Sequence, residues 1–364
     1  MATIQRIIRR TCIAFIAQRY QGKQAASFSL TAFGGCRNEN RATIRHLSKT
    51  IKSSLSSSSS SSSSSFNAPE PPTSRGIPVF EDIDFSIRED TTSESFKRNN
   101  DEDAVFVVTG ANRGIGLQFV KSLFERTNGN IVACCRSPSL AENLNDFVSS
   151  LDSKSSQRVK LVQLDVEDQH SIESAASQIR EAYNRVDVLL NVAGILGDGT
   201  ATPGPERAMS KLDRDWVEKT MSVNVIGPIM LCKELAPLMK SKVRQRKKEN
   251  EERPISVIAN LSARVGSISD NELGGWYSYR FSKSALNQAT RTMAHELKRH
   301  GTYAIALHPG TTDTDLSKPF QRNVQEGRLF PVGFTVSQLL NVIDSMTDKN
   351  SGGLYDWAGK ALPF

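Results

Sequence analysis

From residue 104 onward, short apolar segments alternate with segments of helical periodicity, and this alternation constrains the fold more than any other feature. The predicted strands are residues 104–109, 131–135, 159–164, 186–191, 255–261, 303–308 and 353–357. The predicted helices are residues 114–126, 140–151, 171–183, 216–240, 278–300 and 335–346. Strands joined by helical crossovers form a parallel sheet with helices on both faces. We therefore predict an α/β fold, with residues 104–364 as one doubly wound domain around a parallel sheet of about seven strands.

The chain before residue 104 differs from this domain in charge and composition. Residues 1–65 carry ten Lys and Arg but a single acid, Glu39, and residues 53–65 are all Ser except Leu55. An Arg-rich segment with almost no acid is typical of an organelle presequence, and a Ser tract cannot bury apolar surface. We expect residues 1–65 to be a disordered transit peptide for the mitochondrion or, alternatively, for the plastid. A plain disordered tail with no targeting role is the simpler alternative.

Residues 66–103 reverse the charge of the preceding segment, with ten acidic and four basic residues. Pro69, Pro71, Pro72 and Pro78 disfavour regular structure in the first part of this segment. We therefore predict an extended acidic linker, with residues 83–87 as a candidate short element, and assign it no function.

Composition excludes several other classes of protein. The net charge of +7 arises in residues 1–65, so the folded part is close to neutral and nucleic-acid binding has little support. No apolar run approaches the roughly 18 residues that a membrane span needs. Five cysteines without C-x-x-C spacing argue against both a disulfide scaffold and a zinc site.

The turn after the first predicted strand reads TGANRGIG over residues 109–116. Gly110 permits a tight turn, Gly114 lets the backbone approach a ligand, and Gly116 lets the following helix pack on the strand. The N-terminus of that helix presents free N–H groups and a positive dipole end to a phosphate. Two glycines in such a turn are common, whereas three at this spacing predict a dinucleotide site.

The end of the second predicted strand indicates which dinucleotide the site prefers. NAD sites usually place an acid there to accept from the ribose 2′-hydroxyl, but this strand ends in Arg136. Arg113 adds a second guanidinium in the glycine turn. Two guanidinium groups suit a 2′-phosphate, which a carboxylate would repel. We therefore predict NADP rather than NAD, the alternative being that both arginines are merely exposed.

A tyrosine and a lysine follow the fifth predicted strand in an arrangement suited to proton transfer. Tyr279 and Lys283 are four residues apart on a predicted helix, so they share one face. The ordinary phenol pKa of about 10 is too high for a base at neutral pH. We expect the Lys283 ammonium to favour the phenolate and lower the pKa of Tyr279. The phenol could then act as an acid or a base beside a carbonyl.

In combination, these motifs resemble the short-chain dehydrogenase/reductase family, whose domain is a Rossmann fold. The resemblance covers residues 104–364 and rests on the glycine turn, Asp165 and Val166, residues 191–194 (NVAG), Asn224, Tyr279 with Lys283, and Pro309 with Gly310. Residues 264–268 and 274–280 are similar to the C-factor-like oxidoreductases within that family.

The resemblance implies a role for each matching residue. Asp165 and Val166 would contact the adenine, and Asn191, Ala193 and Gly194 would line the adenosine ribose side. Lys283 would hold the nicotinamide ribose, and Asn224 would hold a water in a proton relay to it. Other implied cofactor-binding residues are Asn112, Arg113, Gly114, Ile115 and Gly116 in the glycine turn, and Pro309, Gly310, Thr312 and Thr314, of which the last two would meet the carboxamide.

One position departs from the family pattern. The family usually has two serines before the glycine that follows the fifth strand, and the second orients the substrate carbonyl. Here Ala263 aligns with that second serine. Ser262 would face the other side of an extended strand unless a bulge turns it inward, and Ser267 could substitute from the loop. We favour Ser262 slightly as the catalytic serine.

These observations predict an NADP-dependent oxidoreductase that interconverts a small-molecule carbonyl and alcohol, with Tyr279, Lys283, Asn224 and Ser262 as catalytic residues. The alternative is a protein that binds NADP(H) for regulation or signalling with little turnover. Trp276, Phe320 and Phe330 are candidate walls of the substrate pocket, and residues 311–334 a candidate lid. Relatives in this family pair their two long helices, so a homodimer or homotetramer is expected.

Overall fold

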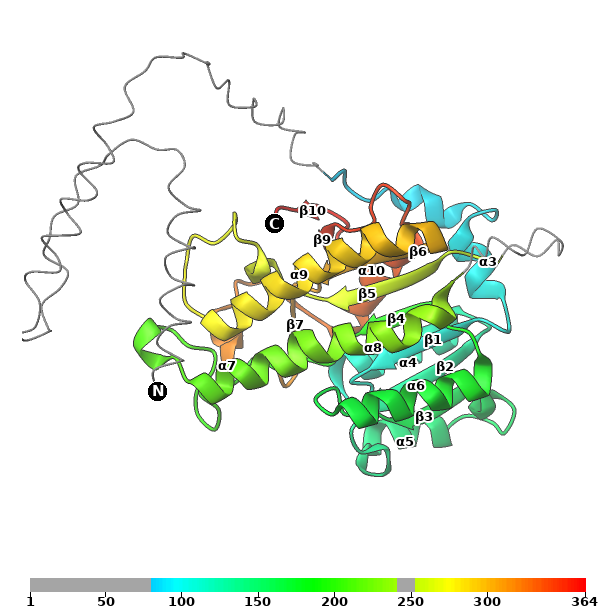
Figure 1. The fold of residues 1–364 in the computed structure, drawn as a ribbon, viewed down its shortest axis with the longest axis horizontal. Helices are drawn as coiled ribbons and strands as arrows, with labels where there is room; N and C mark the ends of the chain where they lie inside the picture. The colour runs from blue at the N-terminus through cyan, green and yellow to red at the C-terminus, as the bar shows by residue number, and fades with distance from the viewer. Residues whose placement is uncertain (1–79, 241–252) are drawn as a thin grey trace, which may run out of the picture. The chain divides into compact units, whose positions relative to one another are not determined.

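The computed structural model describes residues 80–240 and 253–364, and its centre is an eight-stranded sheet (Figure 1). The strand order is β10-β9-β6-β5-β4-β1-β2-β3. The strands are β1 (Val105–Thr109), β2 (Asn130–Cys135), β3 (Val159–Gln163), β4 (Val188–Asn191), β5 (Ser256–Leu261), β6 (Thr302–His308), β9 (Leu354–Asp356) and β10 (Ala361–Leu362). All neighbours pair in parallel except β10, which runs antiparallel to β9. The predicted doubly wound parallel sheet is confirmed, with one additional edge strand.

Helices cover both faces of the sheet, so its strands are buried on both sides. Val105 and Val107 of β1 join a core with α6 (Gln169–Tyr183), α8 (Gly227–Leu235) and α9 (Tyr277–Leu297). Phe106 and Val108 point the other way. They join a core with α4 (Gly114–Arg126), α5 (Glu142–Ser149) and α10 (Val332–Asp344). Alternate side chains of one strand therefore build two separate cores, which explains why the strand is apolar at every position.

The helix predicted over residues 216–240 is longer and less regular than its pattern indicates. It comprises α7 (Arg214–Met221), a π-helical turn (Ser222–Ile226), α8 and a final 3₁₀ turn (Ala236–Met239). By length and composition alone, Arg214–Met239 could cross a membrane, but half of its most apolar window is buried within the fold. Its apolar face packs into the core beside the sheet, as Leu231 and Leu235 show.

The segment predicted as a linker is folded over its second part, so that prediction is wrong for residues 80–103. A 3₁₀ turn (Phe85–Glu89) and α3 (Glu94–Asn100) form there, and Ser93 caps α3 by accepting from Phe96 N at 3.1 Å. Charge and proline content concealed the few apolar residues that anchor the segment, among them Ile83, which is buried. The predicted presequence, the Ser tract and residues 66–79 lie outside the described residues.

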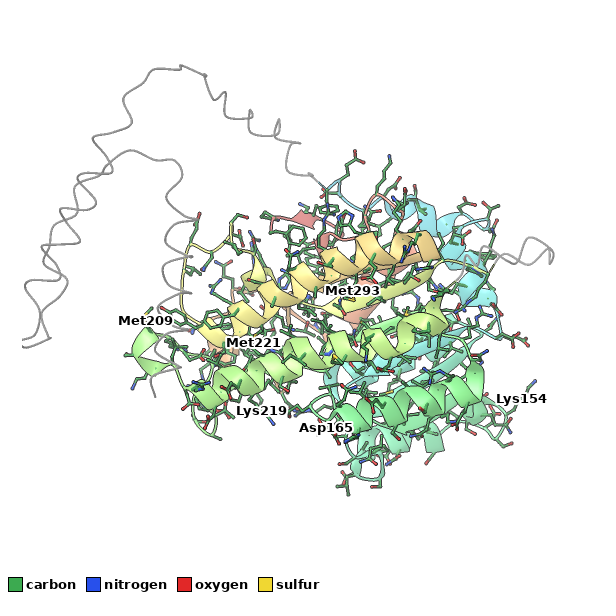
Figure 2. The ribbon with its side chains drawn as sticks, in the orientation of Figure 1. Lys154, Asp165, Met209, Lys219, Met221 and Met293 are labelled. Carbon is green, nitrogen blue, oxygen red and sulfur yellow. The ribbon has the colours of Figure 1, made fainter. Side chains whose placement is uncertain are left out.

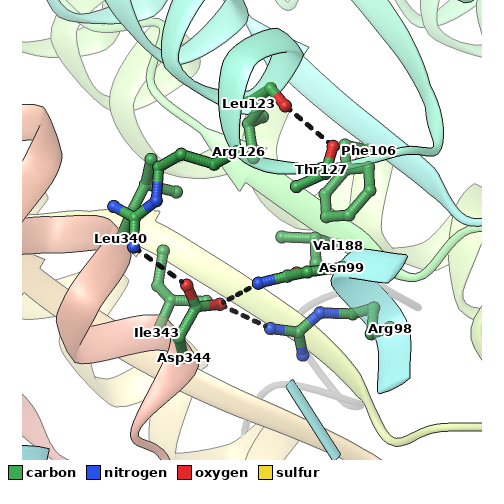
Figure 3. Close-up of a pocket in the computed structure, with 10 residues that line it drawn as sticks. All are labelled: Arg98, Asn99, Phe106, Leu123, Arg126, Thr127, Val188, Leu340, Ile343 and Asp344. Carbon is green, nitrogen blue, oxygen red and sulfur yellow. Dashed lines mark hydrogen bonds and ion pairs between the residues drawn. The ribbon is translucent and has the colours of Figure 1, made fainter. Parts of the chain in front are cut away.

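A buried ion pair fixes this segment to the domain (Figure 3). Arg98 of α3 is 2% exposed and donates to Asp344 of α10 at 2.9 Å, and Asn99 donates to the same carboxylate at 3.2 Å. Arg126 of α4 reaches the second oxygen of Asp344 at 3.4 Å. The cavity between them is only about 10 Å³, room for about one water molecule. This polar cluster is therefore a structural joint and leaves no space for a ligand.

Candidate functional site

A cleft of about 510 Å³ opens beyond the carboxyl ends of the central strands. It spans the point where the sheet order reverses, since β1 pairs with both β2 and β4, and ligands bind at such switch points in α/β folds. Lining residues that the sequence predicts are Gly110, Asn112, Arg113, Gly114, Ile115, Gly116, Arg136, Asp165, Val166, Ala193, Gly194, Ser262, Tyr279, Lys283, Pro309 and Thr314. The fold thus brings residues from six separate turns into one cavity.

The glycine turn has the geometry of a phosphate cradle. Gly110 and Gly114 have φ of +66° and +53°, a region that side chains rarely adopt. A Cβ on Gly116 would lie 2.2 Å from the Gly110 carbonyl oxygen, so this position admits only glycine without a shift of the turn. No side chain caps the N-terminus of α4, and its first three residues, 114–116, line the cleft. This arrangement suits the pyrophosphate of a dinucleotide.

Two arginines and one acid occupy the end of the cleft beside β2. Arg136 follows β2 directly and lines the cleft together with Arg113. Arg113 donates to Asp315 at 3.0 Å, and both side chains are about two-thirds exposed. An exposed pair of this kind contributes little stability. Asp315 belongs to the loop after β6, so this ion pair joins the glycine turn to that loop.

A second ion pair closes the cleft beside Asp165. Lys219 of α7 donates to Glu167 at 2.5 Å, and both side chains line the cavity. Lys219 and Asp165 are labelled in Figure 2, where they lie on the same side of the domain. Sequence reasoning missed Lys219, because its partner Glu167 lies 52 positions away and no local pattern connects the two.

Tyr279 and Lys283 are both on α9, and they line the end of the cleft opposite the glycine turn. Lys283 is 4% exposed, lies with Nζ 5.5 Å from the centroid of the Tyr279 ring, and donates to Leu261 O at 2.8 Å. Burial lowers the pKa of Lys283 to about 8. Desolvation raises the pKa of Tyr279, so the prediction that Lys283 lowers the pKa of Tyr279 is wrong. The physical reason is that removal from water disfavours the charged form of each group.

Ser262 is the serine that the structure places on the cleft. Its Oγ is buried and donates to Asn287 Oδ1 of α9 at 2.6 Å. Ser267 instead lies under the following loop, where its Oγ accepts from Asp270 N at 3.2 Å. Ala263 is buried as well and is not among the lining residues. Of the two serines considered, Ser262 lines the cleft and Ser267 does not.

Two predicted residues lie behind the cleft wall. Asn224, in the π-helical turn, accepts from Ile195 N at 2.8 Å and donates to Ser282 Oγ at 3.1 Å. A Cβ on Gly194 would touch both Asn224 Oδ1 and Lys283 Nζ, at 3.2 and 3.8 Å, so the three residues are neighbours. Asn191 donates to Asn260 Oδ1 at 2.8 Å. Both asparagines thus support lining residues and do not line the cavity themselves.

Gly310 and Thr312 also lie off the cavity, at the root of the predicted lid. Thr312 Oγ1 is 3.0 Å from Thr335 Oγ1. A Cβ on Gly310 would strike the Phe330 ring at 2.7 Å, and Phe330 packs on Trp357 with centroids 4.6 Å apart. Phe330 therefore packs at the base of this segment and does not line the cleft, which corrects its prediction as a wall of the substrate pocket.

The predicted lid, residues 311–334, contains a loop between two short paired strands. β7 (Thr311–Thr312) and β8 (Leu329–Phe330) form a separate two-stranded sheet, with a 3₁₀ segment (Lys318–Asn323) between them. Phe320 of this segment packs against Trp276, with ring centroids 5.3 Å apart. The loop therefore contacts the glycine turn through Asp315 and the start of α9 through Phe320, whereas neither Phe320 nor Trp276 lines the cleft as the sequence predicts.

Comparisons with known proteins agree with this geometry. The short chain dehydrogenase family model matches residues 104–325. An uncharacterized oxidoreductase of Schizosaccharomyces pombe is 31% identical over 272 residues, covering 71% of this chain and 98% of that protein. The C-signal protein of Myxococcus xanthus is 30% identical over 179 residues, covering 49% of this chain and 93% of that protein.

Solved structures give the same result. NADPH-bound carbonyl reductase from chicken fatty liver has a TM-score of 0.61 at 30% identity, covering 72% of this chain and 99% of that chain. Carbonyl reductase Sniffer of D. melanogaster has a TM-score of 0.62 at 25% identity, covering 72% and 100%. With its glycine turn, its Tyr279–Lys283 pair and these relatives, the chain belongs to the short-chain dehydrogenase family of oxidoreductases.

Proposed function

We propose that this protein is an NADP-dependent oxidoreductase that interconverts a small-molecule carbonyl and its alcohol. The observation that carries the proposal is one continuous cleft with a phosphate cradle at one end and Tyr279, Lys283 and Ser262 at the other. A proton donor close to a dinucleotide site is what carbonyl reduction requires. The carbonyl reductases among the similar structures support the same reaction class.

Different residues of the cleft would hold different parts of the dinucleotide. The N-terminus of α4 and the turn from Gly110 to Gly116 would hold the pyrophosphate. Asp165 and Val166 would contact the adenine, and Ala193 and Gly194 the adenosine ribose. Pro309 and Thr314 would meet the nicotinamide end. Asn191, Gly310 and Thr312 would act indirectly, because they support these residues from behind the wall.

The preference for NADP over NAD rests on charge. Arg113 and Arg136 line the cleft where β2 ends, and the strand ends in Cys135 rather than in an acid. Guanidinium groups form strong charge-assisted hydrogen bonds to phosphate. Asp315 accepts from Arg113 and would have to yield that contact when a 2′-phosphate binds.

The protein's part in the reaction is proton transfer and orientation, while the nicotinamide, when bound, donates or accepts the hydride. The raised pKa of Tyr279 keeps the phenol protonated at neutral pH, so its hydroxyl is ready to donate to a carbonyl oxygen in the reductive direction. Lys283 would hold the ribose and supply positive charge beside the phenol. Ser262 would orient the carbonyl, and Asn224 would connect Lys283 to a proton relay.

A second candidate is a protein that binds NADP(H) for regulation or signalling with little turnover. Ala263 at the usual serine position favours it, as does the similarity to the C-signal protein. Titration of the purified protein with NADPH and NADH, followed by NADPH oxidation with a panel of aldehydes, ketones and quinones, separates the two. Robust turnover of any carbonyl excludes the second candidate, and no affinity for either dinucleotide contradicts both.

We also propose mitochondrial targeting by residues 1–65, with the plastid as the alternative, and a homodimer or homotetramer as the working form. The support for the targeting proposal is the basic, acid-poor composition of residues 1–65. Import of a full-length fluorescent fusion into isolated mitochondria and plastids, with N-terminal sequencing of the product, tests the address. Light scattering coupled to size-exclusion chromatography tests the oligomer.

A further inference from the structure

The first turn of α9 carries Tyr279 but has no cap of its own. Tyr279 is the third residue of the helix, and the N-cap position is Trp276, whose side chain makes no capping hydrogen bond. Trp276 also has φ of +55°, which is unusual for a bulky residue. The first N–H groups of a helix need partners from elsewhere, and uncapped ends fray. Another part of the chain must therefore hold this turn if Tyr279 is to stay in place.

Glu206, in the loop between β4 and α7, supplies the missing partners. Its carboxylate accepts from Ser278 N at 3.1 Å and from Ser278 Oγ, and its backbone carbonyl accepts from Trp276 N at 2.5 Å. Glu206 is 1% exposed, a rare position for a carboxylate. Negative charge at a helix N-terminus is favourable because it opposes the helix dipole.

Side-chain hydrogen bonds also hold the loop that precedes α9. Arg280 donates to the carbonyls of Gly275 at 2.9 Å and of Gly274 and Val265, each at 3.2 Å. These contacts hold the chain that leads into Trp276, whose ring lies 6.3 Å from the Tyr279 ring. Two residues therefore hold the first turn of α9. Arg280 holds the preceding loop, and Glu206 holds the N-terminus of the helix itself.

We propose that Glu206 is a positioning residue for Tyr279, acting as a remote N-cap that holds the first turn of α9. The proposal rests on the proposed function, because it assigns Glu206 to the placement of the phenol that transfers the proton. A displacement of about 1 Å at a reacting group can lower the rate on the order of 100-fold. The mechanism has no other use for this buried carboxylate.

Three variants test the assignment. Glu206→Ala removes both side-chain contacts, whereas Glu206→Gln can keep them, because its Oε1 can accept from Ser278 N and its Nε2 can donate to Ser278 Oγ. Ser93→Ala removes a helix cap far along the chain, on α3, and serves as the control. We expect kcat to fall about 10- to 100-fold in Glu206→Ala. Glu206→Gln should recover to within about threefold, and Ser93→Ala should keep the wild-type kcat, with NADPH affinity unchanged in all three.

Amide hydrogen exchange of residues 277–280, followed by mass spectrometry, gives a readout that needs no turnover. We expect exchange there to accelerate at least about tenfold in Glu206→Ala and to stay slow in Glu206→Gln and Ser93→Ala. Wild-type exchange and wild-type kcat in Glu206→Ala would overturn the proposal, as would a Gln variant as impaired as the Ala variant. Absence of carbonyl turnover in the wild-type protein would instead count against the proposed function, while the exchange experiment would still decide the role of Glu206.

Discussion

The two ends of the cleft are built in different ways. At the phosphate end, backbone N–H groups and three glycines within residues 109–116 make most of the site, and one βα turn contains them all. At the end proposed for the carbonyl, α9 carries Tyr279 and Lys283, and separate segments hold this helix. Leu261 at the end of β5 accepts from Lys283, Asn224 in a π-helical turn donates to Ser282, and Glu206 in a third segment accepts from Ser278.

This difference has consequences for substitution. The phosphate end relies on backbone shape, so it should tolerate changes of side chain except where a Cβ cannot fit. The carbonyl end relies on buried polar side chains that hold each other, so loss of one partner leaves the other unsatisfied. Variants at the phosphate end should therefore change dinucleotide affinity, whereas variants at the carbonyl end should change turnover.

The largest effect is expected at the phosphate end. A Cβ at Gly116 would lie 2.2 Å from the Gly110 carbonyl, so Gly116→Ala must displace the turn. We expect the Kd for NADPH to rise by about 100-fold or more, since a shifted turn loses several hydrogen bonds to the pyrophosphate. Fluorescence titration measures it. Gly333→Ala is the control, because a Cβ there meets no atom within 4 Å; equal Kd values for the two variants would contradict the cradle.

At the carbonyl end, Ser262→Ala should lower kcat with little change in NADPH affinity. Loss of one donor to a reacting oxygen can reduce the rate about 100-fold. Steady-state kinetics on any carbonyl that the enzyme reduces provides the measurement. Ser267→Ala should remain close to wild type, because Ser267 lies under the loop and away from the cleft. If Ser267→Ala is the impaired variant, the assignment of the serine is wrong.

A smaller effect is expected for the choice of dinucleotide. Arg136→Ser removes one guanidinium from the end of the cleft, and a hydrogen bond to a charged group contributes about 1.5–3 kcal/mol. We expect the ratio of NADPH to NADH affinity to fall at least about tenfold, with NADH affinity itself unchanged. Arg214→Ala, an exposed arginine paired with Glu218, is the control. An unaltered ratio in Arg136→Ser would mean that Arg136 is merely exposed.

The smallest predicted effect is on the pH dependence of reduction. Because burial lowers the pKa of Lys283 to about 8, the ammonium is charged below that pH and neutral above it. Reductive kcat/KM for NADPH, which reports the free enzyme, should be flat below about pH 7 and fall about fivefold between pH 8 and pH 9, because the charged fraction of Lys283 falls by that factor. Lys283→Met should have a lower kcat/KM than the wild type at every pH and should show no decline between pH 8 and pH 9. A wild-type profile that rises through this interval would contradict the assignment.

The sequence predicts what is local and misses what depends on distant contacts. Strand and helix periodicity predicted the sheet, and the spacing of Gly110, Gly114 and Gly116 predicted the cradle. β10 has only two residues, too few for a pattern. The fold of residues 80–103 depends on Arg98 finding Asp344, which is 246 positions away.

The same limit applies inside the site. Tyr279 and Lys283 were found from their spacing, but the direction of the Tyr279 pKa shift was not, because burial depends on everything packed around the phenol. Glu206 gave no signal at all, since nothing in the sequence indicates that its loop reaches the start of α9. Residues that hold other residues are therefore the part of an active site that sequence reasoning is least able to find.

The central claim is that Tyr279 transfers the proton beside a dinucleotide held by the glycine turn. Single-turnover oxidation of NADPH by wild-type and Tyr279→Phe protein, with a carbonyl substrate from the panel as hydride acceptor, tests it most directly together with the NADPH Kd of each. We predict a rate at least about 100-fold lower in Tyr279→Phe, with the two Kd values within about threefold. A Tyr279→Phe protein that oxidises NADPH at the wild-type rate would contradict it.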